Sequence, residues 1–167
     1  LGRKLDLMDP NKFEFCIIKD FPMYEWNEEE EKYDFTHNPF NNPKGGSKAL
    51  ENENIDEIVA EQFDFVCNGV EMASGAVRNH DPEVMKKAFA VVGLGEDVIE
   101  EKFGALYTAF QYGAPPHAGM APGIDRILML LKDEENIREM VAFPLGANGA
   151  DAMMGCPVEV FEEQLRE

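Results

Sequence analysis

The sequence predicts an α/β (α+β) fold, in which strands and helices share one domain. Two extended, largely apolar stretches at residues 62–67 and 70–78 predict neighbouring strands. A turn rich in glycine and proline leads into residues 124–131, whose apolar side chains recur at helical spacing and predict a buried helix. Because no internal repeat or low-complexity linker divides the chain, we expect one compact unit over residues 1–167.

The first strand is expected at residues 13–18, where apolar side chains alternate and then run continuously towards Pro22. The acidic run at residues 27–32 predicts a solvated hairpin loop and not a metal site. Residues 41–47 are rich in Asn, Pro and Gly and predict a polar loop, of the kind that often forms a mobile lid over a site. Residues 49–60 give at most a short amphipathic turn.

Two further helices follow the strands. Asp81 at the N-cap and Pro82 at the first helical position predict a helix that Gly93 closes. A second helix is expected between Gly95 and Gly113. The stripes of apolar residues on both helices predict core positions: Met85, Ala88, Phe89, Val92, Ile99, Phe103, Leu106 and Phe110.

The two ends of the chain are expected to be less regular. Residues 140–144 predict a short buried segment, residues 146–149 a loop, and residues 158–165 a last short helix. The chain begins at Leu1 and not at Met, and residues 1–10 read as the tail of a preceding segment. We therefore expect a piece of a longer protein.

Composition limits the partners of this chain. Lys and Arg total 15 against 33 Asp and Glu, which gives a net charge of −18. Such a surface repels phosphate backbones, so the chain is not expected to bind nucleic acid by itself. The three cysteines, Cys16, Cys67 and Cys156, are far apart and favour a reducing cytoplasm. No apolar run reaches membrane-spanning length, and no signal peptide is evident, so we expect a soluble cytoplasmic protein.

Two charges begin the helix expected at residues 124–131. Asp125 suits the positive end of a helix dipole, whereas Arg126 needs another partner there. Free backbone N–H groups, the preceding Gly123 and a forked guanidinium together suit phosphate oxygens. The alternative is that Arg126 pairs only with Asp125 or a nearby carboxylate, and the tetrapeptide Gly-x-Asp-Arg alone favours that alternative.

Polar side chains also interrupt the two central strands. Asp64, Glu71, Ser74 and Arg78 lie in stretches that otherwise look buried, and burial of such groups is unfavourable without partners. An ion pair between Glu71 and Arg78, or plain exposure, would explain them. A separation of seven places Glu71 and Arg78 on opposite faces of a regular strand. A bulge at Ser74 and Gly75 would bring both side chains into one cleft.

Longer segments of the sequence resemble a known protein family. Gly-Ala-Pro-Pro-His-Ala-Gly-Met-Ala-Pro-Gly-Ile-Asp-Arg, which ends at Arg126, resembles motif 3 of class II aminoacyl-tRNA synthetases in the form found in bacterial-type aspartyl-tRNA synthetases. Residues 68–78 and the stretch His37-Asn38-Pro39-Phe40 are similar to other segments of the same family. The resemblance spans nearly the whole chain. It implies the class II catalytic fold, a mainly antiparallel sheet flanked by helices, here incomplete, with the helix at 124–131 packed along the sheet.

The resemblance also implies roles for single residues. It assigns ATP to one strand glutamate and to the start of the last long helix: Glu71, Gly123, Ile124, Asp125 and Arg126. It assigns Mg²⁺ to Asp64, Glu71 and Ser74, whose hard oxygen atoms suit this ion. L-aspartate would contact His37 and Arg78, with the Arg78 guanidinium on its side-chain carboxylate. Arg78 and Arg126 are the expected catalytic residues.

The implied activity is that of an aspartate–tRNA ligase. Such an enzyme joins L-aspartate to ATP, which gives aspartyl-adenylate and pyrophosphate, and then transfers aspartate to tRNA. Positioning and charge neutralisation carry the first step without a protein nucleophile. Alternatives are a related aspartate-adenylating ligase, similar to asparaginyl-tRNA synthetase or asparagine synthetase, or a non-catalytic nucleotide-binding paralogue.

Family motifs 1 and 2, including the Phe-Arg-x-Glu arginine, have no counterpart in these residues, and neither does the anticodon-binding barrel. Residues 1–167 are therefore expected to be the C-terminal portion of the catalytic domain. We expect negligible activity from the chain alone, a homodimeric parent, and tRNA contacts made by other parts of that parent.

Overall fold

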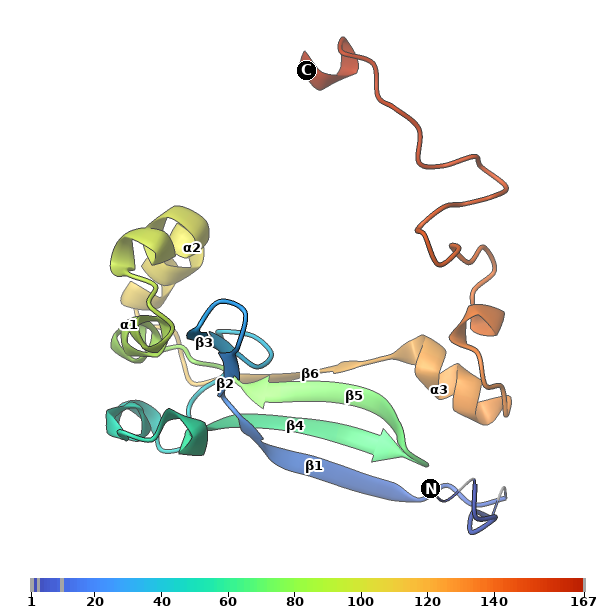
Figure 1. Ribbon diagram of the computed structural model, residues 1–167, viewed down its shortest axis with the longest axis horizontal. Coiled ribbons are helices and arrows are strands. Elements are labelled where there is room, and N and C mark those ends of the chain that lie inside the picture. The colour runs from blue at the N-terminus through green and yellow to red at the C-terminus, as the bar shows by residue number, and fades with distance from the viewer. Residues whose placement is uncertain (1, 3, 10, 167) are drawn as a thin grey trace. The chain divides into compact units, whose positions relative to one another are not determined.

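The computed structural model describes residues 2, 4–9 and 11–166. They fall into two compact units, Leu1–Pro122 and Gly123–Glu167, and not into the single unit that the sequence predicted (Figure 1). The first unit holds the sheet, the two longer helices and every fully buried apolar side chain among the described residues. None of the helices in the described part of the chain is long and apolar enough to cross a membrane.

A four-stranded antiparallel sheet forms the centre of the first unit. Its strands β1 (Phe15–Pro22), β4 (Val59–Cys67), β5 (Val70–Val77) and β6 (Ala118–Pro122) lie side by side in that order (Figure 1). The strand predictions are confirmed, although β1 and β4 are longer than expected. Asn68-Gly69 joins β4 to β5 with positive φ at both residues, as a tight hairpin turn requires.

Strand β6 was not predicted, because its glycine and proline content favours an irregular turn over a strand. It forms because the β5 backbone comes close enough to pair with it at Gly75. A Cβ atom on Gly75 would lie 2.5 Å from the carbonyl oxygen of Gly119 and 2.7 Å from the Phe63 ring. Because Gly75 has no Cβ atom, the β6 backbone can approach β5 more closely than any other residue at this position would allow.

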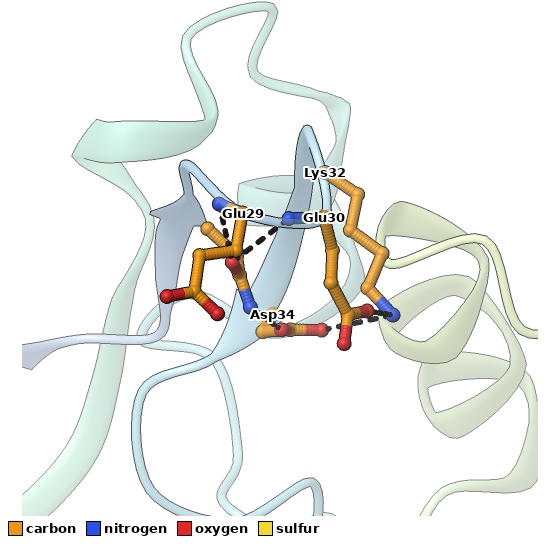
Figure 2. A network of polar contacts seen from close by, with 5 residues as sticks. Glu29, Glu30, Lys32 and Asp34 are labelled. Carbon is orange, nitrogen blue, oxygen red and sulfur yellow. Dashed lines mark hydrogen bonds and ion pairs between the residues drawn. The ribbon is translucent and has the colours of Figure 1, made fainter.

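The acidic run is the loop of a hairpin between β2 (Tyr24–Asn27) and β3 (Lys32–Phe35), as predicted. Asn27 holds the loop: its side-chain oxygen accepts hydrogen bonds from the backbone N–H groups of Glu29 and Glu30 at 3.0 and 3.1 Å (Figure 2). Lys32 pairs with both Glu30 and Asp34, so it offsets part of the loop's negative charge. The acidic run is thus a structural turn.

The hydrophobic core lies at the end of the sheet where β5 leads into the helices (Figure 1). Helix α1 (Pro82–Val91) begins where predicted, because the Asp81 side chain accepts hydrogen bonds from two backbone N–H groups of the first turn. Helix α2 (Glu96–Gln111) packs against it, and two short 3₁₀ helices, Gly46–Glu51 and Ile55–Glu57, complete this layer. The largest buried side chains here are Tyr24, Met85, Phe89, Ile99 and Tyr107.

The stripe of core residues predicted on α2 was wrong at one position. Leu106 is 39% exposed, while the neighbouring Tyr107 is 1% exposed. The Tyr107 hydroxyl donates a 2.7 Å hydrogen bond to Glu96, and this partner makes its burial possible. Lys86 of α1 lies 2.8 Å from the same carboxylate.

The network of Lys86, Glu96 and Tyr107 predicts a pH dependence of stability. Hydrogen bonds from Lys86, and then from Tyr107, lower the pKa of Glu96 below its ordinary value. Because the folded pKa is depressed, the stabilisation is complete above the ordinary glutamate pKa and is lost as the pH falls through the folded value. In urea unfolding, wild type should exceed Glu96→Gln in midpoint at pH 7, and the difference should shrink as the pH falls below the ordinary glutamate pKa. A difference in midpoint that stays constant as the pH falls would contradict this assignment.

The second unit contains α3 (Ile124–Leu131) and the 3₁₀ helices Ile137–Met140 and Gln164–Arg166. Three expectations fail here. No described residue of this unit is buried, so neither α3 nor residues 140–144 form buried segments, and the helix predicted at 158–165 is reduced to its last turn. Helices this short depend on packing for their stability, and the apolar side chains of α3 remain largely exposed.

Candidate functional site

A bulge in β5 decides which side chains share a face of the sheet. Phe65 pairs with Ala73, but the next residue, Val66, pairs with Glu71, so that Met72 is the extra residue. Directly paired residues place their side chains on the same face, and Val66 is two residues from Asp64 along β4. Glu71 therefore lies on the same face as Asp64. The parity is reset as expected, but at Met72 and not at Ser74 and Gly75.

We call this side of the sheet the pocket face, defined by the paired residues Asp64, Ser74 and Ala121. Side chains two residues apart along a strand lie on the same face, so Arg78 lies on the same face as Ser74. The pocket face therefore carries both charged groups that were predicted to meet, Glu71 and Arg78. Both side chains are exposed. Arg78 makes no ion pair with any described residue, so the core ion pair considered from the sequence does not form.

A pocket of about 300 Å³ opens on the pocket face. Its floor is one cross-strand row that contains Gln62 of β4 and two small residues, Ala76 of β5 and Gly119 of β6. The lining residues are Asn38, Asn41, Gln62, Ser74, Gly75, Ala76, Arg78, Gly119, Met120 and Ala121. A hollow of this size, with one cation and several amide and hydroxyl groups, suits a small polar ligand that carries a carboxylate.

The loop that was expected to be a lid is held in the sheet over its first half. Residues 41–44 lie between the diverging ends of β4 and β5, where Asn42 accepts a backbone hydrogen bond from Glu61 and donates one to Val77. Asn41 forms an antiparallel bridge with Arg78, and Pro43 forms one with Ala60. These contacts fix the backbone of the segment, and of its residues Asn41 alone lines the pocket.

The pocket contains two amide side chains that the sequence did not single out. Asn41 is 2% exposed and Gln62 is 6% exposed, and the Asn41 amide nitrogen donates a 2.8 Å hydrogen bond to the Gln62 side-chain oxygen. Their signal in the sequence was weak. Asn41 lies in a polar loop rich in asparagine, and Gln62 looks like the exposed start of a strand.

The predicted metal residues share the pocket face. One carboxylate oxygen of Asp64 is buried and has no hydrogen-bond partner among the described residues. Asp64 and Ser74 are directly paired across β4 and β5. The described residues contain no group of three or more His, Cys, Asp or Glu side chains that could hold a metal ion. Two carboxylates suit Mg²⁺, which usually takes few protein ligands and completes its shell with phosphate oxygens and water.

His37 does not line the pocket. Its ring is exposed and packs edge-on against Phe21, with ring centroids 5.3 Å apart. The adjacent Asn38 is the residue that reaches the pocket lining. The expected contact between His37 and aspartate stays a prediction, and the pocket boundary alone favours Asn38.

The predicted ATP residues Gly123, Ile124, Asp125 and Arg126 lie in the second unit, where Gly123 caps α3 and the others form its first turn. Asp125 is exposed at the helix start, in keeping with the helix dipole. Arg126 is half-buried. This first turn presents backbone N–H groups beside a guanidinium.

A larger hollow of about 740 Å³ lies elsewhere in the first unit, at the turn end of β4 and β5. Its lining includes Leu7, Met8, Asn68 and Val70, and none of the predicted site residues. Size alone favours this hollow, but it lacks the arginine and paired amide groups that mark the smaller pocket. The chemistry of the lining therefore selects the smaller pocket as the candidate site.

Comparison with solved structures defines the fold class. Aspartyl tRNA synthetase from Entamoeba histolytica matches with a TM-score of 0.59 and 26% sequence identity, over 82% of this chain and 23% of that chain. Asparaginyl-tRNA synthetase from the same organism matches with a TM-score of 0.58 and 20% identity, over 82% of this chain and 27% of that chain. The antiparallel sheet flanked by helices is therefore the fold of class II aminoacyl-tRNA synthetases, as the sequence led us to expect.

The family model "tRNA synthetases class II (D, K and N)" matches residues 3–147, and the chain belongs to this family. "Aspartate--tRNA(Asp/Asn) ligase" from Phenylobacterium zucineum is 58% identical over 167 residues, which is 100% of this chain and 28% of that protein. "Aspartate--tRNA ligase" from Streptomyces coelicolor is 57% identical over 159 residues, 95% of this chain and 27% of that protein. The chain thus spans just over a quarter of the length of these relatives.

Proposed function

We propose that this chain is the C-terminal portion of the catalytic domain of an aspartate–tRNA ligase. The parent activates L-aspartate with ATP, releases pyrophosphate, and transfers the aspartyl group to tRNA. The observation that carries the proposal is the bulge at Met72, because it places Glu71 on the face that also carries Asp64, Ser74 and Arg78. The relatives named aspartate–tRNA ligase, with 57% and 58% identity, support the same reading.

In this proposal the pocket of about 300 Å³ holds L-aspartate. The Arg78 guanidinium takes the side-chain carboxylate through two parallel N–H donors, which is the strongest arrangement for that pair of groups. The small side chains of Ala76 and Gly119 leave room for the substrate between strands. His37 would contact L-aspartate only after its ring moves away from Phe21, so we assign it a secondary role in aspartate binding.

The pocket face also supplies oxygen ligands for Mg²⁺. The unpartnered oxygen of Asp64 suits a cation, because a buried carboxylate oxygen without a donor is otherwise unfavourable. Glu71 is the second carboxylate on this face, and Ser74 adds a hydroxyl. Bound Mg²⁺ would neutralise negative charge on the phosphates of ATP. Asp64 of β4 and Glu71 of β5 would hold the ion, and the Ser74 hydroxyl of β5 would add a further oxygen ligand.

In the second unit, the start of α3 is proposed to bind ATP. Gly123, Ile124 and Asp125 supply backbone surface and N–H groups, and Arg126 supplies a fixed positive charge for the γ-phosphate or a flat surface for adenine. This arrangement stabilises phosphate charge as the adenylate forms, without a protein nucleophile. Arg78 positions the attacking amino acid, and Arg126 acts on ATP.

The proposed parent is a cytoplasmic homodimer that contacts tRNA through regions other than these 167 residues. The net charge of −18 supports this division, since such an acidic chain repels a phosphate backbone. The chain alone is then expected to bind aspartate weakly and to activate it negligibly.

Titration of the ¹⁵N-labelled chain with L-aspartate tests the proposal. In wild type, amide shifts of pocket residues should move and saturate. Arg78→Leu should bind aspartate about a hundredfold more weakly, because two charge-assisted hydrogen bonds are lost. Arg138→Leu is the matched control, since Arg138 lies in the second unit and donates to the Leu145 carbonyl. Equal affinity of Arg78→Leu and wild type would contradict the proposal.

A further inference from the structure

One buried acceptor in the candidate pocket has no partner. The side-chain oxygen of Asn41 is buried and accepts no hydrogen bond from any described residue. The amide nitrogen on the same side chain is fixed, because it donates to Gln62 at 2.8 Å. With one end of the amide held, the free oxygen has a defined position. An acceptor left in this state carries a free-energy cost that a suitable donor would remove.

A suitable donor is the nearest charged neighbour on the same face. Asn41 and Arg78 are directly paired by an antiparallel bridge, so their side chains leave the backbone side by side. Both residues line the pocket. A guanidinium has five N–H donors, and that of Arg78 has no hydrogen-bond partner among the residues that the structure describes.

The backbone of Arg78 is already fixed, unlike its guanidinium. Its N–H donates to the His117 carbonyl at 2.9 Å, and its own carbonyl lies 3.3 Å from the His80 ring nitrogen. These backbone hydrogen bonds do not hold the long Arg78 side chain, which loses rotamer freedom when it binds a ligand. A neighbouring acceptor that holds one N–H would reduce that loss.

We propose that Asn41 is a positioning residue for Arg78. When a carboxylate enters the pocket, the Asn41 oxygen accepts one guanidinium N–H while two others take the carboxylate, and Gln62 keeps the Asn41 amide in the required orientation. A guanidinium held in this plane presents paired donors, which match two carboxylate oxygens and mismatch the NH₂ group of a carboxamide. Asn41 thereby contributes to selection of aspartate over asparagine. This inference rests on the proposed function.

Three ligands distinguish this role from a direct contact. L-aspartate, succinate and L-asparagine are titrated separately into the ¹⁵N-labelled 167-residue chain. Succinate keeps both carboxylates and lacks the ammonium group, while asparagine replaces the side-chain carboxylate. Asn41→Leu should weaken aspartate and succinate by the same factor, about tenfold, because one hydrogen bond to a charged group is lost. Asparagine binding should be unchanged, so the ratio of aspartate to asparagine affinity should fall.

Matched variants separate positioning from loss of folding. Asn42→Leu is the control, because Asn42 is the next residue, its amide hydrogen bond goes to Glu61, and it does not line the pocket. It should leave all three affinities unchanged. Gln62→Leu frees the Asn41 amide and should weaken both dicarboxylates in the same direction. In an Arg78→Leu background, Asn41→Leu should have no further effect, since its target is gone.

The outcomes separate this inference from the function on which it rests. If wild type binds neither dicarboxylate, the proposed function fails, and this inference fails with it. If wild type binds both and Asn41→Leu binds them equally well, only the positioning role is overturned. A loss confined to aspartate would indicate contact with the ammonium group and would also overturn it.

Discussion

Replacing Gly75 by alanine should destabilise the first unit by roughly 2–3 kcal/mol, the upper range for overpacking in a closely packed site. The added Cβ would lie 2.5 Å from the Gly119 carbonyl oxygen and 3.1 Å from the Met120 Cα, and both of these are backbone atoms that cannot rotate away. Strand β6 must therefore move from β5. Because Gly119 and Ala121 line the pocket, aspartate binding should weaken together with stability.

Urea unfolding followed by circular dichroism measures this effect, with Gly104→Ala as the control. Gly104 lies inside α2, and a Cβ there would meet no atom within 4 Å. Because alanine favours helix over glycine, Gly104→Ala should be neutral or more stable by about 0.5–1 kcal/mol. Equal midpoints for Gly75→Ala and wild type would show that β6 does not depend on close approach at Gly75.

Phe89→Ala should cost about 3–5 kcal/mol, a large part of the stability of an ordinary domain. Phe89 is 1% exposed, and its ring lies within 5.7 Å of both Phe35 and Phe103, measured between centroids. It also contacts Phe40, the residue before Asn41. Its loss should therefore loosen the wall of the pocket as well as the core.

The same urea experiment measures this prediction, and Phe143→Ala supplies a matched control. Phe143 is 70% exposed in the second unit, and its truncation should change stability by less than about 0.5 kcal/mol. If Phe89→Ala unfolded at the same urea concentration as Phe143→Ala, the core assigned between α1, α2 and the hairpin would be wrong.

Local signals in the sequence were sufficient for most of the first unit. The N-cap at Asp81, the Asn-Gly turn at Asn68 and the acidic hairpin loop all depend on neighbours in sequence, and each forms where it was expected. Strand β6 depends instead on the space that Gly75 leaves on another strand. A local pattern of glycine and proline cannot report that distant contact, so it was read as an irregular turn.

The failures in the second unit have a different origin. The apolar spacing of α3 indicates which side chains prefer burial, but burial also requires a surface to pack against. Ile124 and Leu131 remain 63% and 65% exposed. The apolar pattern therefore predicted the helix correctly and predicted its burial incorrectly.

Only some residues of the candidate site could be predicted from the sequence. The charged residues could be identified because Glu71 and Arg78 are conspicuous within apolar strands, and parity reasoning required a bulge. Its position at Met72 depends on pairing with β4, which one strand alone does not reveal. Asn41 enters the pocket because it forms a bridge with Arg78, directly after β5, and this contact between residues 37 positions apart has no local signature.

The most direct test of the central claim is the location of bound aspartate in the isotope-labelled chain, by nuclear Overhauser contacts from its β-protons to protein methyl groups. We expect contacts to the Ala76 and Ala121 methyl groups in wild type and their loss in Arg78→Leu. Contacts to Leu7, Met8 or Val70 would place the ligand in the larger hollow instead. That result would contradict the assignment of the pocket beside Arg78 as the aspartate site.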